Sequence, residues 1–150
     1  MRKVLLLAPS AVLAIMAGSA AAAEIEVKTL NKRVEGAMVF EPALVKNAPG
    51  DTVRFVATDR GHNAESIKGV LPADATPFVG KNGEDVAMAF DKAGIYGVKC
   101  LPHYGMGMVA MVVVGTPASV GEARAVPQVG KAKQVMAGLF ERLAAQTAQK

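Results

Sequence analysis

Nine consecutive residues, 100–108, contain the only cysteine of the chain and one of its two histidines. They read Cys-Leu-Pro-His-Tyr-Gly-Met-Gly-Met, so that Cys100 and His103 are followed by two methionines. The second histidine, His62, lies far upstream in Gly61-His62-Asn63. A thiolate, two imidazoles and a thioether are the ligand set of a blue-copper site. A fold that uses this set must bring the chain around residue 62 against residues 100–108.

Each of these residues has a simpler explanation when it is taken alone. A lone cysteine is usually a small buried apolar side chain, and single histidines and methionines are often structural. The joint arrangement favours a metal site, because one set uses all the cysteine and histidine in the chain. Spacing leaves both Met106 and Met108 open as the fourth ligand. We favour Met108, because it adjoins the next expected strand, whereas Met106 lies between two glycines.

Residues 1–22 are expected to be a signal peptide rather than part of the fold. Arg2 and Lys3 precede an apolar run, and the alanines at positions 20–23 allow cleavage after Ala22 or Ala23. The domain would then span residues 23–150, with C-terminal helices from about residue 117, and would lie in the periplasm. A single cysteine permits no internal disulfide, so an exported Cys100 calls for burial or ligation.

The charge balance excludes one class of partner. Lys and Arg number 17 against 13 Asp and Glu, and Arg2 and Lys3 belong to the expected leader. The remaining positive charge is too small for nucleic-acid binding by bulk charge. We expect a monomer that binds neither nucleic acid nor a membrane.

Short alternating segments bounded by turns predict a mainly β protein. Strands are expected near residues 24–28, 38–40, 43–45, 52–58, 66–67, 86–90, 95–99 and 109–114. The last is continuously apolar, which predicts burial on both faces. This pattern is typical of a Greek-key β-sandwich. Two C-terminal α-helices should follow at 119–126 and 131–146, the second with an apolar stripe formed by Ala132, Val135, Met136, Leu139, Leu143 and Ala144.

The mature sequence resembles the pseudoazurins, small blue-copper proteins of the cupredoxin superfamily. The resemblance is carried by residues 30–32, 36–42, 48–53, 61–63, 67–69 and 94–109 and by the two C-terminal helices. It implies a cupredoxin-like fold and one copper ion, Cu(I)/Cu(II), held by His62, Cys100, His103 and Met108. It also implies a periplasmic electron shuttle that serves a copper nitrite reductase or another denitrification enzyme. Residues 71–85 carry little of the match, and Arg60 stands where the family often has lysine.

Three further residues are expected to support the ligands. The Asn63 amide could join the two ligand loops, and its backbone N–H could donate to the Cys100 sulfur. Pro102 would stiffen the loop and remove a donor near the thiolate. Met38 falls where the family has a side chain close to a ligand imidazole. The simpler alternatives are an ordinary turn asparagine for Asn63, a turn proline for Pro102 and core packing for Met38.

The exposed edge of His103 is expected to be the electron port. An apolar collar would surround it, formed by Gly61, Pro102, Gly105 and Met106. A basic ring of Lys32, Arg60, Lys68, Lys81 and Lys99 would steer redox proteins with acidic docking surfaces, such as copper nitrite reductase and cytochromes, into a transient complex. The simpler explanation of each basic residue is solvation.

Two other functions are alternatives to an electron carrier. An enzyme would use Cys100 as a nucleophile and a histidine as its base, but no supporting motif accompanies them, so we expect no enzyme. A periplasmic copper carrier is the main alternative. It would need an open, exchangeable site rather than one buried mixed ligand set.

Overall fold

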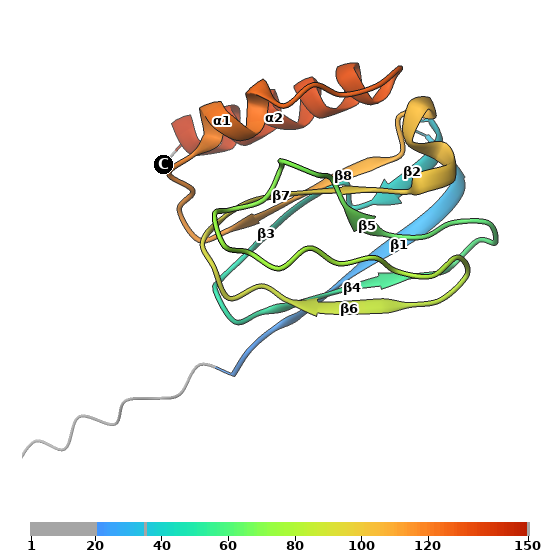
Figure 1. Ribbon diagram of the computed structural model, residues 1–150, viewed down its shortest axis with the longest axis horizontal. Helices are drawn as coiled ribbons and strands as arrows, with labels where there is room; N and C mark the ends of the chain where they lie inside the picture. The colour runs from blue at the N-terminus through green and yellow to red at the C-terminus, as the bar shows by residue number, and fades with distance from the viewer. Residues whose placement is uncertain (1–20, 35, 150) are drawn as a thin grey trace, which may run out of the picture.

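The computed structural model describes residues 21–34 and 36–149, which form two facing β-sheets and a helical layer (Figure 1). The expected signal peptide falls almost entirely outside the described residues. The first sheet has the strand order β2-β1-β4-β6 and the second the order β3-β8-β7-β5. The strands are β1 (Glu24–Arg33), β2 (Gly36–Glu41), β3 (Leu44–Asn47), β4 (Thr52–Val56), β5 (Glu65–Ser66), β6 (Val86–Ala89), β7 (Gly94–Lys99) and β8 (Val109–Val114). This arrangement confirms the predicted β-sandwich.

Each of the two sheets contains one parallel pair of strands, and its other pairs are antiparallel. β1 runs parallel to β4 and β3 runs parallel to β8, while the other neighbouring strands are antiparallel. Between the sheets, Phe40, Phe55, Phe78, Phe90 and Tyr96 form a continuous line of ring contacts, with centroids 4.7 to 6.4 Å apart. These rings supply much of the core in a chain that has no tryptophan.

β8 is buried along its whole length, as its apolar sequence predicted. Alternate side chains of a strand point to opposite faces of the sheet. Ala110, Val112 and Val114 therefore join the core between the sheets, while Met111 and Val113 join a second apolar cluster under the helices.

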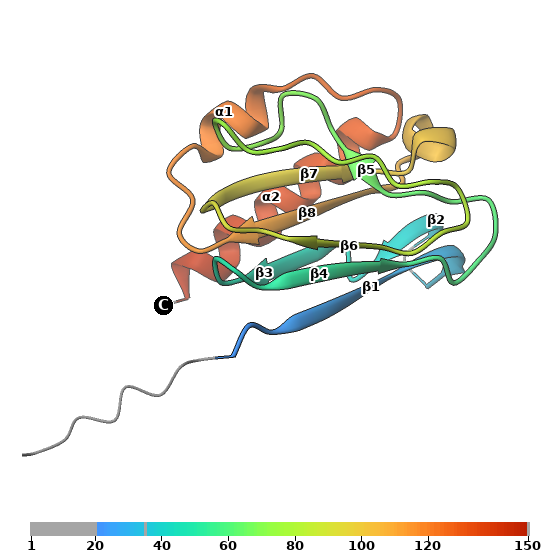
Figure 2. The same ribbon diagram turned by 60° about the horizontal axis from the view of Figure 1, so that its bottom comes forward.

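The helical layer consists of α1 (Val120–Ala125) and α2 (Ala132–Ala148), which cover the outer face of the β3-β8-β7-β5 sheet (Figure 2). The buried side of α2 is formed by Ala132, Met136, Leu139, Phe140 and Leu143. Ala144 is exposed, although the predicted stripe included it. Phe140, one turn earlier in the helix, is buried instead and widens the contact with the sheet. Among the described residues, no helix combines the length and apolar character of a membrane span.

Two segments differ from the expected boundaries. β1 continues to Arg33, past the turn expected from residue 32, because residues 28–33 pair with β2. Residues 101–106, expected as an open loop, form a short 3₁₀ helix, η1 (Leu101–Met106), between β7 and β8. This helix and the loop that follows β4 lie at the same end of the sandwich (Figure 2).

Candidate metal centre

His62, Cys100 and His103 meet at that end of the sandwich. Cys100 Sγ lies 3.6 Å from His62 Nδ1 and 3.5 Å from His103 Nδ1, and the two imidazole nitrogens are 3.0 Å apart. Bonds of about 2.0 to 2.3 Å from nitrogen and sulfur to a first-row ion place two ligands of one ion roughly 3 to 4 Å apart. The spacing of the donors therefore fits a single metal ion. It is the one group of this kind among the described residues.

The two methionines near this cluster have different surroundings. Met108 is fully buried and belongs to the same apolar cluster as Cys100. Met106 is 48% exposed at the end of η1. Only Met108 is therefore enclosed with the cysteine, although sequence spacing allowed either methionine as a ligand.

Backbone hydrogen bonds link the three candidate ligands of this loop in a ring. Cys100 N–H donates to the Met108 carbonyl (3.0 Å), Met108 N–H donates to the His103 carbonyl (3.2 Å), and His103 N–H donates to the Cys100 carbonyl (3.2 Å). Gly107 permits the closing turn because its φ of 96° is in the left-handed region. The backbone thus fixes the relative positions of all three residues.

The His62 ring is oriented from β1. Its Nε2 lies 2.8 Å from Oδ1 of Asn31. Since an amide oxygen only accepts, Nε2 carries the proton and Nδ1 offers its lone pair toward Cys100. Asn31 was not among the residues expected to support the ligands. It lies beyond the strand expected at residues 24–28, so no local pattern pointed to this contact.

Asn63 lies between the two ligand-bearing segments. Its Oδ1 accepts a hydrogen bond from the Leu101 backbone N–H at 2.7 Å. Its Nδ2 donates to Oε2 of Glu65 at 3.0 Å and to the Gly80 carbonyl at 3.1 Å. The Asn63 amide therefore links the segment that carries His62 to Leu101, the residue after Cys100.

Burial controls the protonation of the donors. It is the main cause that lowers the pKa of His62, and the nearby His103 acts in the same direction while Asp59 opposes it. A lowered pKa keeps the imidazole neutral at pH 7, which is the form that binds metals. Burial raises the pKa of the Cys100 thiol, while the backbone N–H groups of Asn63 and His103 lower it. These N–H groups would stabilise negative charge on the sulfur.

The expected docking residues are not all alike in the structure. Those that are exposed are Gly61, Pro102, Gly105, Met106, Lys32, Arg60, Lys68 and Lys81. Lys99 differs, because only 19% of its side chain is exposed and its Nζ lies 3.3 Å from Oε1 of Glu65. Leu101, at 57% exposure, is an apolar surface residue that was not among those expected around His103. Met38 is half-buried against the core of the sandwich.

The fold and this donor set define a class of metalloprotein. The chain belongs to the plastocyanin/azurin family of copper-binding proteins, whose sequence profile matches residues 27–115. Copper is therefore the metal that the centre is built to hold, and the four candidate side chains are placed to bind it.

Within that family, the chain is similar to pseudoazurins. It is 54% identical to the pseudoazurin of Methylorubrum extorquens over 96 residues, 64% of this chain and 65% of that one, so that it spans just under two thirds of this relative. It is 45% identical to the pseudoazurin of Paracoccus pantotrophus over 132 residues, 87% of this chain and 91% of that one. The crystal structure of native pseudoazurin from Hyphomicrobium denitrificans matches with a TM-score of 0.77 and 42% identity, covering 80% of this chain and 98% of that one. The resemblance found in the sequence is confirmed, and the chain is a blue-copper electron-transfer protein with a cupredoxin fold.

Replacing Asn31 with alanine tests the orientation of His62. Loss of the acceptor for Nε2–H leaves the ring free to turn, so copper affinity should fall about 10- to 100-fold. Competition with a chelator of known affinity measures this change. Gln146→Ala, at an exposed position of α2, is the control and should leave the affinity unchanged. Equal affinities of the Asn31→Ala and unaltered proteins would contradict this role.

Proposed function

We propose that this chain is a periplasmic one-electron shuttle with a type 1 copper site, and that it passes electrons to a respiratory or denitrification enzyme. The observation that carries the proposal is the convergence of the Cys100 sulfur with two imidazole nitrogens at 3.5 and 3.6 Å. Similarity to pseudoazurins supports it. The specific partner and the cellular location are parts of the proposal.

In this proposal, copper is held by Nδ1 of His62, Sγ of Cys100, Nδ1 of His103 and the thioether of Met108. When bound, copper supplies the one-electron Cu(I)/Cu(II) couple. The soft thiolate and thioether suit Cu(I), and the imidazoles suit both oxidation states. All four donors can thus serve both states without exchange of ligands.

The chain prepares this site by fixing its donors in advance. Asn31 holds the His62 ring, and Asn63 joins the His62 side of the site to Leu101. A donor set that keeps its shape needs little rearrangement when the charge changes, which favours fast electron transfer. Positioning by neighbouring hydrogen bonds is the general way in which proteins tune a metal site.

The surroundings also exclude water from most of the site. His62, Cys100 and Met108 are fully buried, whereas His103 is half-buried. His103 is therefore the one candidate ligand with a surface edge, and we assign it as the port for electrons. Burial of three donors also favours an electron carrier over a copper carrier, since a carrier must release its ion.

The surface around His103 suits a partner that binds briefly. Leu101, Pro102, Gly105 and Met106 give it exposed apolar area. Lys32 and Arg60 stand next in sequence to Asn31 and Gly61, and both are exposed. Positive charge beside an apolar contact would steer the acidic surface of a redox enzyme, such as copper nitrite reductase or a cytochrome, and still allow rapid release. We propose that the carrier acts as a monomer in this complex.

Contacts at the start of the fold bear on where a signal peptide would be removed. Ala23 N–H donates to Oδ1 of Asp51 at 2.8 Å, and the Ala23 carbonyl accepts from Thr52 N–H at 2.9 Å. The bonds from Ala23 and then Ala48 lower the pKa of Asp51. Cleavage after Ala22 keeps both contacts of Ala23 and turns its N–H into an ammonium beside the carboxylate. Cleavage after Ala23 would remove both.

We therefore expect the exported chain to begin at Ala23. The intact mass of protein recovered from a periplasmic fraction measures this directly. A mass that corresponds to a first residue of Glu24, or to the full 150 residues, would contradict the assignment.

The ligand set is tested by colour and by metal content. The copper-loaded protein should hold one copper per chain, be intensely blue when oxidised and be colourless when reduced. Cys100→Ala should abolish the colour, because the thiolate is its source. Met108→Ala should alter the visible and paramagnetic resonance spectra, whereas Met106→Ala should leave them unchanged. The reverse result for the two methionines would overturn the assignment of Met108, and a colourless Cu(II) protein would favour the copper carrier.

The docking surface is tested by charge reversal. Changing Lys32 and Arg60 together to glutamate should lower the rate of electron transfer to an acidic partner about tenfold at low salt, and should reduce its salt dependence. Stopped-flow mixing with a copper nitrite reductase measures the rate. Lys46→Glu is the control, since exposed Lys46 pairs in register with Val113, toward the end of β8 remote from the site. If Lys46→Glu lowers the rate as much as the double change of Lys32 and Arg60, the docking role of the surface around His103 is contradicted.

A further inference from the structure

The short helix η1 carries His103, yet none of its six residues is buried. A segment without buried side chains cannot fix its shape by its own packing. The ring of backbone bonds holds His103 relative to Cys100 and Met108, but it does not hold η1 against the neighbouring segments. The placement of the loop as a whole therefore depends on contacts that other segments make with it.

The segment that precedes α2 makes such contacts from the C-terminal side. The Tyr104 hydroxyl donates to Oε1 of Gln128 at 2.7 Å. The Gln128 amide is itself oriented, because its Nε2 donates to the Val126 carbonyl at 3.2 Å. Tyr104 directly follows His103, so this bond acts next to the proposed electron port.

A second contact joins the two backbones. Lys131 N–H donates to the Gly105 carbonyl at 2.9 Å. Gly130 comes so close that a Cβ built on it would lie 2.5 Å from the same carbonyl oxygen. Gly130 also has a φ of 51°, in the region that glycine adopts most readily. Glycine is thus required here by both the conformation and the close approach.

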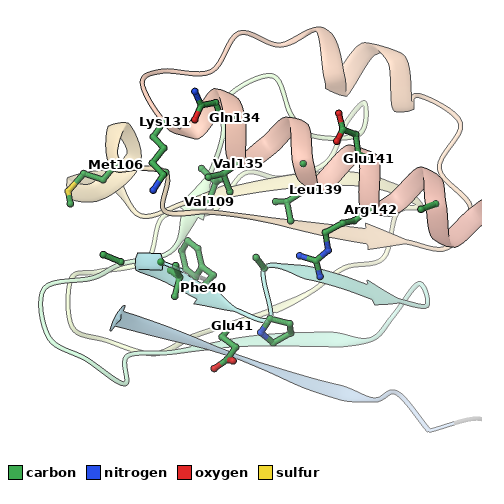
Figure 3. Close-up of a pocket in the computed structure, with 18 residues that line it drawn as sticks. Phe40, Glu41, Met106, Val109, Lys131, Gln134, Val135, Leu139, Glu141 and Arg142 are labelled. Atoms are coloured by element: carbon green, nitrogen blue, oxygen red, sulfur yellow. The ribbon is translucent and has the colours of Figure 1, made fainter. Parts of the chain in front are cut away.

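The start of α2 continues this contact along the loop. A Cβ on Gly107 would lie 3.0 Å from Cγ2 of Val135. Lys131 and Val135 lie beside the turn that carries Met106, at one end of a groove of ≈ 780 Å³ between β2 and α2 (Figure 3). Gly107, which is buried, is therefore covered by this segment just before the loop reaches Met108.

The ring of Tyr104 also lies near an ion pair. Nζ of Lys99 lies 5.0 Å from the centre of the Tyr104 ring and 3.3 Å from Oε1 of Glu65. Glu65 also accepts the hydrogen bond from Asn63. Tyr104 thus contacts both the ion pair that adjoins Asn63 and the C-terminal segment.

We propose that residues 128–131, called the clamp below, position the metal loop, and that the C-terminal helices serve the copper site through them. Gln128 and Gly130 are positioning residues, which act through their contacts with Tyr104 and Gly105. The inference rests on the proposed function, because it assigns the loop to copper. It gives the helical layer a role in electron transfer in addition to covering the sheet.

Gly130→Ala tests the clamp, and Gly138→Ala is its matched control. Both add one methyl group, but a Cβ on Gly138, within α2, meets no atom within 4 Å. In the copper-free protein, Gly130→Ala should cause loss of amide-exchange protection at Gly107 and Met108, and Gly138→Ala should not. In the copper-loaded protein, Gly130→Ala should shift the visible and paramagnetic resonance spectra while one copper per chain is retained.

Gln128 provides an independent test. Gln128→Leu removes the acceptor for Tyr104 and should give the same kind of spectral shift, whereas Gln128→Glu keeps an acceptor and should restore the original spectrum. If Gly130→Ala and Gln128→Leu match Gly138→Ala in amide exchange and in the spectra, or lower only thermal stability, the proposed role of the clamp is wrong. If the unaltered protein is not blue but the exchange results hold, the proposed function fails and the structural link remains.

Discussion

The structure depends on one requirement, which is that two loops far apart in sequence present their donor atoms to a common point. The hydrogen bond from Leu101 N–H to the Asn63 amide meets this requirement most directly, because it joins the residue after His62 to the residue after Cys100. Unpaired polar groups in such a buried place would be costly. Both polar atoms of the Asn63 side chain have hydrogen-bond partners, Oδ1 in Leu101 and Nδ2 in Glu65 and Gly80, and these bonds keep the two loops together.

The sandwich supplies the rigid base for this meeting. β7 ends at Lys99 and β8 begins at Val109. The two strands are antiparallel, and Lys99 pairs with Val109 at the base of the loop. The metal loop is thus closed at its base by a sheet that is buried on both sides. The helices cover this sheet, because their buried side chains pack against Met111 and Val113. They also extend to the loop itself. Rigid strands and a supported loop together explain how an exposed turn can carry a well-defined metal ligand.

Much of this arrangement could be predicted from the sequence, because it is local or compositional. The continuous apolar run at 109–114 indicated a strand with two buried faces, and a single cysteine with two histidines indicated one metal site. The contacts that orient the site could not be predicted in the same way. Asn31, Glu65 and Gln128 act through tertiary hydrogen bonds, and no local pattern specifies such partners. Lys99 was expected in the exposed basic ring, yet the fold turns it toward Glu65 and Tyr104.

The central claim is that the chain fixes the donors before and throughout the change of oxidation state. X-ray absorption spectra of the oxidised and reduced copper protein measure the metal's neighbours in both states. The account predicts two nitrogens and one short sulfur bond in each state, with nearly the same distances. Loss of a ligand on reduction, or the absence of a sulfur neighbour in the oxidised form, would contradict it.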